Sequence, residues 1–180
     1  MPATRLLVPD DALAIADVLR ANRGFLAAWQ PVRGEEYFTD DGQRQVVGTA
    51  LEQHELGASV PLVILDEQAR TVGMLTLQSI IRGCFQSCSV GYWLAESAQG
   101  QGLATAALRE AADVAFRDLR LHRVQAETLT YNLRSQRVLA RVGFVKYGVA
   151  EAYLKIAGTW QDNVLYQLLT PAPELVAVPA

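Results

Sequence analysis

Hydrophobic and polar residues recur along this chain with two periods, and the changes between them predict an order of helices and strands. Leu13, Ala16 and Leu19 recur at helical spacing behind Asp10 and Asp11, either of which can cap a helix that runs to about residue 22. An apolar element follows at 25–29, and further helices are expected at 40–56, 101–118 and 132–141. Strands are expected at 60–65, 71–81, 85–94, 123–129, 144–149 and 163–169.

This order, three strands in a meander and then strand–helix–strand units, predicts a mixed α/β sheet with helices on both faces. Local signals mark several helix ends. Thr39 and Asn132 are good N-cap residues, and Gly57 and Gly143 follow predicted helices. We expect one domain over residues 1–170 and a frayed Pro- and Ala-rich tail over 171–180.

Composition narrows the class of protein. The chain has 180 residues, 51% of them hydrophobic, which suffices for one core, and its net charge of −3 argues against nucleic acid as the main ligand. No apolar run spans a bilayer and no signal peptide is recognisable, so we expect a cytoplasmic protein without a membrane partner. Cys84 and Cys88 lie on one predicted hairpin without a histidine cluster, which favours reduced thiols and no metal site.

The segment after the strand at 85–94 carries the most specific chemistry. Residues 99–105 read Gln-Gly-Gln-Gly-Leu-Ala-Thr and lead from that strand into an alanine-rich helix. Such a turn directs free backbone N–H groups and a helix N-terminus at a phosphate. The P-loop pattern fails at Leu103 and Ala104, and a dinucleotide fingerprint is weakened by Thr105. Plain turn chemistry remains an alternative at this point.

Four blocks in order resemble the GNAT (general N-acetyltransferase) superfamily, and together they touch residues 5 to 170. The Gln-x-x-Gly-x-Ala turn, at 99–104, is similar to its acetyl-CoA motif, and Asn132-x-x-Ser135 with the Val-Gly-Phe at 142–144 is similar to its next segment. Asn22–Pro31 and Tyr153–Asp162 resemble the branch that acetylates the N-termini of ribosomal proteins.

The resemblance implies the GNAT acyl-CoA N-acyltransferase fold, whose mostly antiparallel sheet has splayed middle strands, here 85–94 and 123–129. Acetyl-CoA would lie in that wedge as co-substrate. The cofactor-binding residues expected from the match are Tyr92, Trp93, Leu94, Gln99, Gly100, Gln101, Gly102, Leu103, Ala104, Thr105, Asn132 and Ser135. One of Arg134, Arg137 and Arg141 could reach the ribose phosphate, although a solvated basic face is the plainer interpretation.

Acetyl transfer needs a base for the amine and a proton for the leaving thiolate. Glu127 is the predicted base, in the strand that lines the wedge, and its alternative is a solvated or paired strand residue. Glu151 is a second candidate, although the family's acidic residue corresponds to Ala152, and this offset of one residue would turn the Glu151 side chain to the opposite face of a strand. Ser135 is the predicted partner of the thiolate. The expected acceptor groove is formed by Trp29, Tyr37, Glu151 and Tyr153, although aromatic residues are individually more often core.

We therefore expect an acetyl-CoA-dependent N-acetyltransferase that acts by direct attack in a ternary complex, as a monomer or homodimer. The expected acceptor is a protein N-terminal α-amine, whose pKa of about 8 makes it easier to deprotonate than lysine. Two alternatives stay open: acetylation of a small amine such as an amino acid, polyamine or antibiotic, and a non-catalytic acyl-CoA-binding regulatory module.

Overall fold

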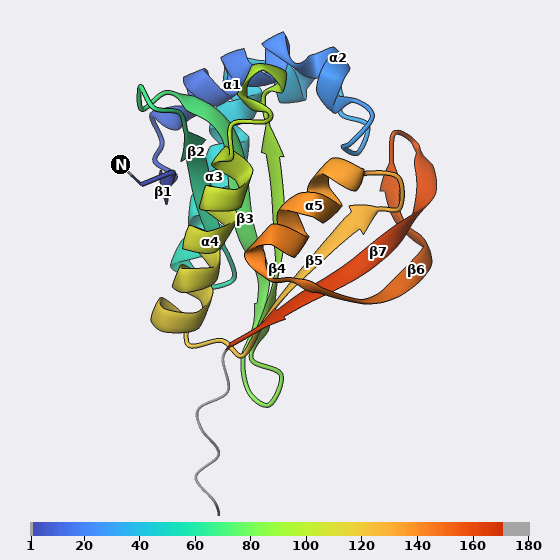
Figure 1. Cartoon of the computed structure of the whole chain (residues 1–180). Coiled ribbons are helices and arrows are strands. Elements are labelled where there is room, and N and C mark those ends of the chain that lie inside the picture. Colours follow the sequence, from blue (N-terminus) through green and yellow to red (C-terminus); the bar gives the residue numbers. More distant parts are fainter. Residues whose placement is uncertain (1, 171–180) are drawn as a thin grey trace, which may run out of the picture.

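The computed structural model describes residues 2–170, which form one seven-stranded sheet in the order β1-β2-β3-β4-β5-β7-β6 (Figure 1). Neighbouring strands in this part of the chain are antiparallel except β4 and β5, which run parallel. The strands are β1 (Thr4–Leu6), β2 (Val60–Leu65), β3 (Thr71–Ile81), β4 (Ser87–Leu94), β5 (Arg123–Leu129), β6 (Val145–Ile156) and β7 (Thr159–Leu169).

Helices cover both faces of this sheet. Successive side chains of a strand point to opposite faces, and both faces of β2 are apolar. Val63 packs with one helix layer, while Leu62 and Ile64 pack with the other. The first layer contains α1 (Asp11–Ala21) and α3 (Asp40–Glu55); the second contains α4 (Leu103–Asp113), and α5 (Leu133–Val142) lies beside α4. The short elements are α2 (Arg23–Leu26), the 3-10 turns Glu35–Phe38 and Glu96–Ala98, and the π turn Val114–Asp118.

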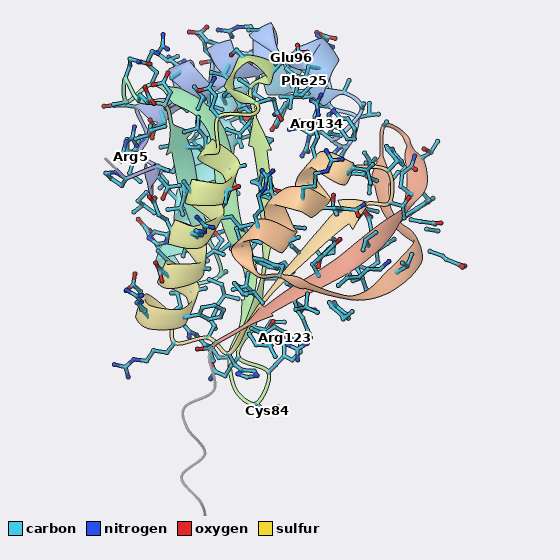
Figure 2. The ribbon with its side chains drawn as sticks, in the orientation of Figure 1. Arg5, Phe25, Cys84, Glu96, Arg123 and Arg134 are labelled. Atoms are coloured by element: carbon cyan, nitrogen blue, oxygen red, sulfur yellow. The ribbon has the colours of Figure 1, made fainter. Side chains whose placement is uncertain are left out.

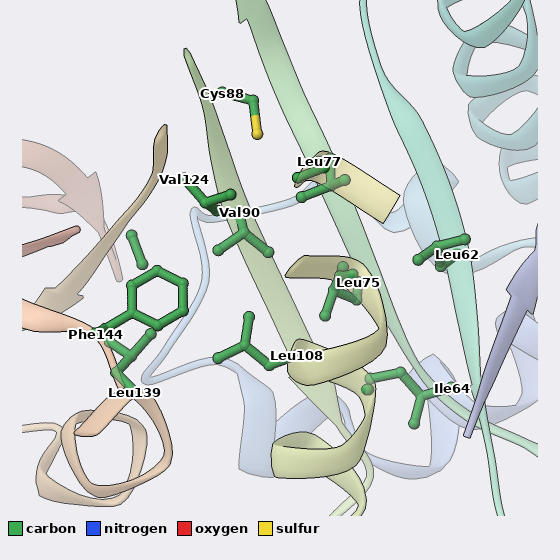
Figure 3. Packing of buried hydrophobic residues seen from close by; sticks show 14 of the residues in the cluster. Leu62, Ile64, Leu75, Leu77, Cys88, Val90, Leu108, Val124, Leu139 and Phe144 are labelled. Atoms are coloured by element: carbon green, nitrogen blue, oxygen red, sulfur yellow. The ribbon is translucent and has the colours of Figure 1, made fainter. Parts of the chain in front are cut away.

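The second layer packs closely because α4 is rich in alanine. Figure 3 shows Leu108 of α4 among Leu75 and Val90 of the sheet, with Leu139 of α5 nearby. All four side chains are at most 3% exposed. Burying one such side chain stabilises the fold by about 1.5–3 kcal/mol, so this core fixes α4 and α5 against the strands that flank the site.

The helix-end signals at Thr39, Asn132 and Gly143 are confirmed. The Thr39 hydroxyl accepts a hydrogen bond from the Gly42 N–H at 3.0 Å, and the Asn132 side chain accepts one from the Ser135 N–H at 3.1 Å. Gly143 adopts a φ of 105° directly after α5, a conformation that favours glycine. Neither acidic residue caps α1 as expected. Asp10 makes no capping bond, and Asp11 instead accepts the Val8 N–H and pairs with Arg5 at 2.7 Å.

Several element boundaries differ from the predictions. Strand β1 was not predicted, and it joins the edge of β2 while the Glu110 carboxylate accepts the Ala3 and Thr4 N–H groups. The last two strands, expected at 144–149 and 163–169, extend toward each other into one long hairpin. The helix expected at 101–118 is regular to Asp113 and ends in the π turn.

Cys84 and Cys88 are free thiols, and burial raises the pKa of Cys88 to about 12. Each helix within residues 2–170 is too short or too polar to cross a lipid bilayer. The tail expected at 171–180 lies outside the described residues.

Candidate functional site

Strands β4 and β5 separate along most of their length. They pair only where Ser87–Ser89 lie beside Arg123–Gln125, and beyond these residues the two strands diverge (Figure 1). A cavity of about 630 Å³ opens between Val90–Leu94 on one side and Ala126–Leu129 on the other. The split that the sequence predicted is therefore present, and its size suits a small-molecule ligand.

The glycine turn lies at one end of this split. Gly100 and Gly102 have φ of 77° and 82°, and α4 begins directly afterwards at Leu103. The backbone N–H groups of residues 100–105 donate to no acceptor elsewhere in residues 2–170. Free N–H groups at the start of a helix form an anion-binding site, as the sequence suggested.

A second cavity of about 450 Å³ extends the split past this turn. The turn lines one side of it, and Arg134, Arg137 and Arg141 of α5 line the other. Figure 2 shows Arg134 at the start of α5, on the open side of the split. Cationic side chains thus face the free N–H groups, an arrangement suited to a ligand with several phosphates.

Tyr92 and Ser135 meet across the split. The Tyr92 Oη atom lies 3.0 Å from the Ser135 Oγ atom, although the two residues are 43 positions apart. Burial raises the pKa of Tyr92, and the Ser135 hydrogen bond opposes part of that shift. A protonated phenol beside a hydroxyl can pass a proton into the cavity. The sequence motifs indicated both residues, but no local pattern indicated that they touch.

Glu127 lies on β5 and lines the same cavity. Burial raises the pKa of its carboxyl, and hydrogen bonds from its own backbone and the Ser89 side chain oppose the shift. A carboxylate with a raised pKa is a better proton acceptor than an ordinary one. The structure thus brings the predicted base into one cavity with the predicted partner of the thiolate.

The other predicted cofactor residues also converge. All except Gln101 line one or both cavities: Tyr92, Trp93, Leu94, Gln99, Gly100, Gly102, Leu103, Ala104, Thr105, Asn132 and Ser135. The Gln101 side chain is exposed and instead donates to the Ser97 carbonyl oxygen at 2.9 Å. The side chain of Gln101 therefore lies outside the two cavities.

The four expected groove residues separate into two pairs. Trp29 and Tyr37 line the larger cavity, whereas Glu151 and Tyr153 do not. Glu151 and Tyr153 belong to a bulge of β6, where the register with β7 jumps between Ala150 and Leu154. Both side chains are exposed, although burial and the charge of Glu127 raise the pKa of Tyr153. The bulge therefore leaves both side chains exposed and outside the cavity lining.

The loop after α2 forms part of the wall of the larger cavity. The Gln30 carbonyl oxygen accepts the Ala157 N–H from the β6–β7 turn at 3.0 Å, and the Trp29 and Tyr131 rings lie 6.0 Å apart. Asn163 of β7 also lines the cavity, although the sequence did not single it out. No trio of side chains within residues 2–170 is suited to hold a metal ion.

Comparisons with known proteins agree with this geometry. Residues 4–145 match the family model described as "Acetyltransferase (GNAT) domain". The [ribosomal protein uS5]-alanine N-acetyltransferase of Escherichia coli (strain K12) is 36% identical over 168 residues, which cover 93% of this chain and 87% of the relative.

Solved structures give the same result. The ribosomal-protein-S5-alanine acetyltransferase of Vibrio fischeri is 34% identical with a TM-score of 0.87, over 92% of this chain and 91% of that one. Mycobacterium smegmatis RimJ in complex with CoA-disulfide is 31% identical with a TM-score of 0.88, over 93% of this chain and 83% of that one. The fold expected from the sequence motifs is confirmed.

Proposed function

Because this chain belongs to the GNAT acetyltransferase family, we propose that it acetylates the α-amine of a protein N-terminus with acetyl-CoA as donor. Family membership makes the chain an acetyl-CoA-dependent N-acetyltransferase. The choice of acceptor is our proposal. The observation that carries the transfer reaction is one cleft, in which the free N–H groups, Glu127 and the Tyr92–Ser135 pair all open onto two cavities that share lining residues.

On the donor side, the turn at 100–105 would hold the pyrophosphate through its free N–H groups. Arg134, Arg137 and Arg141 would balance the remaining phosphate charge. The pantetheine arm would lie between β4 and β5, where its amides can pair with strand N–H and C=O groups that the split leaves open. The complex of Mycobacterium smegmatis RimJ with CoA-disulfide supports a CoA compound as the ligand of this fold.

The chemistry that we assign is direct attack. The neutral amine nitrogen attacks the thioester carbonyl carbon, and Glu127 accepts the proton that the nitrogen loses. The carbon–sulfur bond then breaks, and the departing thiolate takes a proton from Ser135, which Tyr92 can resupply across their 3.0 Å contact. Holding the two substrates side by side in the cleft supplies much of the rate enhancement.

Two observations favour a protein N-terminus as acceptor. The relatives named above are ribosomal-protein alanine N-acetyltransferases, and they match more than nine-tenths of this chain. An α-amine also needs only a weak base, which suits a single half-buried carboxylate. A ribosomal-protein acceptor implies action in the cytoplasm. One chain supplies every group named here, so a monomer would suffice, and the monomer-or-homodimer expectation stays a prediction.

The test is a screen for acetyl-CoA-dependent release of free thiol. The panel should contain peptides that begin with alanine or serine, the same peptides with a blocked N-terminus and an internal lysine, a polyamine and free amino acids. We expect turnover on the free N-termini and little on the blocked peptides. Turnover confined to small amines would contradict the proposed acceptor. Tight acetyl-CoA binding without turnover on any amine would instead identify a regulatory binding module.

A further inference from the structure

Arg33 is the only cationic side chain of residues 2–170 that lines the larger cavity alone. The other charged residues of that cavity are Glu127 and Arg134, and Arg134 also lines the second cavity, where it faces the glycine turn. Arg33 lies in the chain between Trp29 and Tyr37, the two expected groove residues that line the larger cavity. The phosphates of the donor therefore leave Arg33 unused, and we place it on the side of the acceptor.

The Arg33 guanidinium is supported by an aromatic ring but has no anionic partner. Its Cζ atom lies over the Tyr37 ring, 4.7 Å from the ring centre. An arginine that stacks on a ring keeps its N–H groups available, because they lie in the plane of the guanidinium. Within residues 2–170, the Arg33 side chain donates no hydrogen bond and forms no ion pair.

A neighbouring arginine shows the same arrangement with its partner present. The Cζ atom of Arg23 lies 4.4 Å from the centre of the Phe38 ring, and its guanidinium also donates to the Glu35 carboxylate at 2.8 Å. Arg33 has the ring but lacks the carboxylate. Because Arg33 lines the cavity and Arg23 does not, the missing carboxylate can come from a molecule that enters the cavity.

The ring below Arg33 is itself held in position. The Gln43 side chain of α3 is 1% exposed and donates from Nε2 to the Tyr37 carbonyl oxygen at 2.6 Å. The Tyr37 and Phe38 rings meet edge to face, with their centres 5.4 Å apart. A binding group that is already in place loses less entropy when its ligand arrives.

The size of the cavity limits which part of an acceptor can reach Arg33. A sphere of about 630 Å³ is about 11 Å across, which is the length of roughly three extended residues. A peptide whose amine lies at Glu127 therefore reaches the cavity rim with its second, third or fourth residue. The planar fork of an arginine matches the two oxygens of a carboxylate.

We propose that Arg33 binds an acidic side chain at the second, third or fourth residue of the acceptor polypeptide. This inference rests on the proposed function, and it narrows the acceptors to N-termini that carry an early aspartate or glutamate. Arg33 is thus assigned to specificity, whereas Glu127 serves any amine.

The experiment compares peptides that differ in a single charge. All begin with alanine and have an amidated C-terminus, and each peptide with glutamate at position two, three or four has a match with glutamine there. We expect the wild type to prefer at least one glutamate peptide by about tenfold in kcat/KM, mainly through KM. Arg33→Gln should remove this preference, and Arg33→Glu should reverse it in favour of a peptide with lysine at that position.

Arg120→Gln is the matched control. Arg120 is also exposed and forms no ion pair within the described part of the chain, but it lines neither cavity. This variant changes the net charge by the same amount and should keep the wild-type preference. Arg33→Lys retains the charge without the planar fork and should retain only part of the preference.

Equal wild-type rates on every glutamate peptide and its glutamine match would overturn the inference, as would a preference that Arg33→Gln leaves intact. An equal loss on all peptides in Arg33→Gln would also overturn it and leave Arg33 a structural residue. Failure of the wild-type protein to acetylate any free N-terminus would instead overturn the proposed function. Thermal unfolding checks that each variant is folded, and Arg33→Lys serves for the comparison if Arg33→Gln is not.

Discussion

Replacing Gly102 with valine should abolish acetyl-CoA binding while the fold survives. Gly102 precedes α4 with a φ of 82°, and a Cβ atom added there would meet nothing within 4 Å. That open space belongs to the cavity in which we place the pyrophosphate. A valine side chain would fill part of it, and the strained φ would also turn the neighbouring N–H groups away from the ligand.

The valine at position 102 should affect folding stability and CoA affinity separately, and each effect has its own magnitude. A non-glycine residue in the left-handed region costs about 1–3 kcal/mol of folding stability. Hydrogen bonds to charged groups contribute about 1.5–3 kcal/mol each, so losing two of them weakens binding by roughly a hundred- to ten-thousandfold. Gly57→Val is a control that distinguishes the loss of stability from the loss of affinity. Gly57 has a φ of 71° and equally open surroundings, but it lies at the end of α3, outside both cavities.

The assay is calorimetric titration with CoA, alongside thermal unfolding of Gly102→Val, Gly57→Val and the wild type. Both variants should lose similar stability, and only Gly102→Val should lose affinity. A folded Gly102→Val variant that binds CoA as tightly as the wild type would refute the assignment of the turn. Equal loss of affinity in both variants would show that the effect comes from stability alone.

Three further predictions concern catalysis and stability. Glu127→Gln should lower the rate of thiol release, most visibly at low pH where fewer amines are neutral, and should leave acetyl-CoA affinity unchanged. Equal rates for this variant and the wild type at every pH would exclude Glu127 as the base. Because burial raises the pKa of Glu127, ionisation opposes folding as pH rises through that pKa, so this variant should gain thermal stability over wild type near pH 8 but not near pH 4. Ser135→Ala and Tyr92→Phe should each slow the chemical step by roughly ten- to a thousandfold and weaken CoA binding far less. The double variant should lose less rate than the product of the two single losses, and multiplicative losses in single-turnover kinetics would mean that the two residues act independently. Burial works to raise the pKa of Asp11, but hydrogen bonds from Arg5 and the Val8 N–H lower it overall, so Asp11→Asn should cost about 1–3 kcal/mol of folding stability at pH 7. In denaturant unfolding, the difference in stability between this variant and the wild type should disappear as the pH falls below about 4, and a difference that stays constant with pH would argue against the ion pair.

Features set by neighbouring residues could be predicted from the sequence. Thr39 and Asn132 cap helices through N–H groups three residues away, and the turn around Gly102 depends on its own backbone. The split followed from the resemblance to a known fold. These features need no knowledge of distant contacts.

Features set by distant residues could not be predicted. The contact between Tyr92 and Ser135 exists because two strands diverge around a cavity, and no local pattern encodes it. Glu151 was expected in the groove, but the Asp162 carboxylate of β7 accepts the Ala152 N–H at 2.8 Å and holds a bulge that leaves Glu151 exposed. Strand β1 has three residues, too few to show a period.

The divergence of β4 and β5 also gives the protein two internal edge strands. Beyond Ser89 and Gln125, the backbone N–H and C=O groups of β4 and β5 do not hydrogen-bond to each other. Open strand edges of this kind can pair with other polypeptide chains and so promote aggregation. A ligand arm lying in the split would cover both edges, much as an added strand would. A molecule that binds only the folded state raises its stability with concentration. The co-substrate that the enzyme consumes would therefore also protect it from aggregation between turnovers.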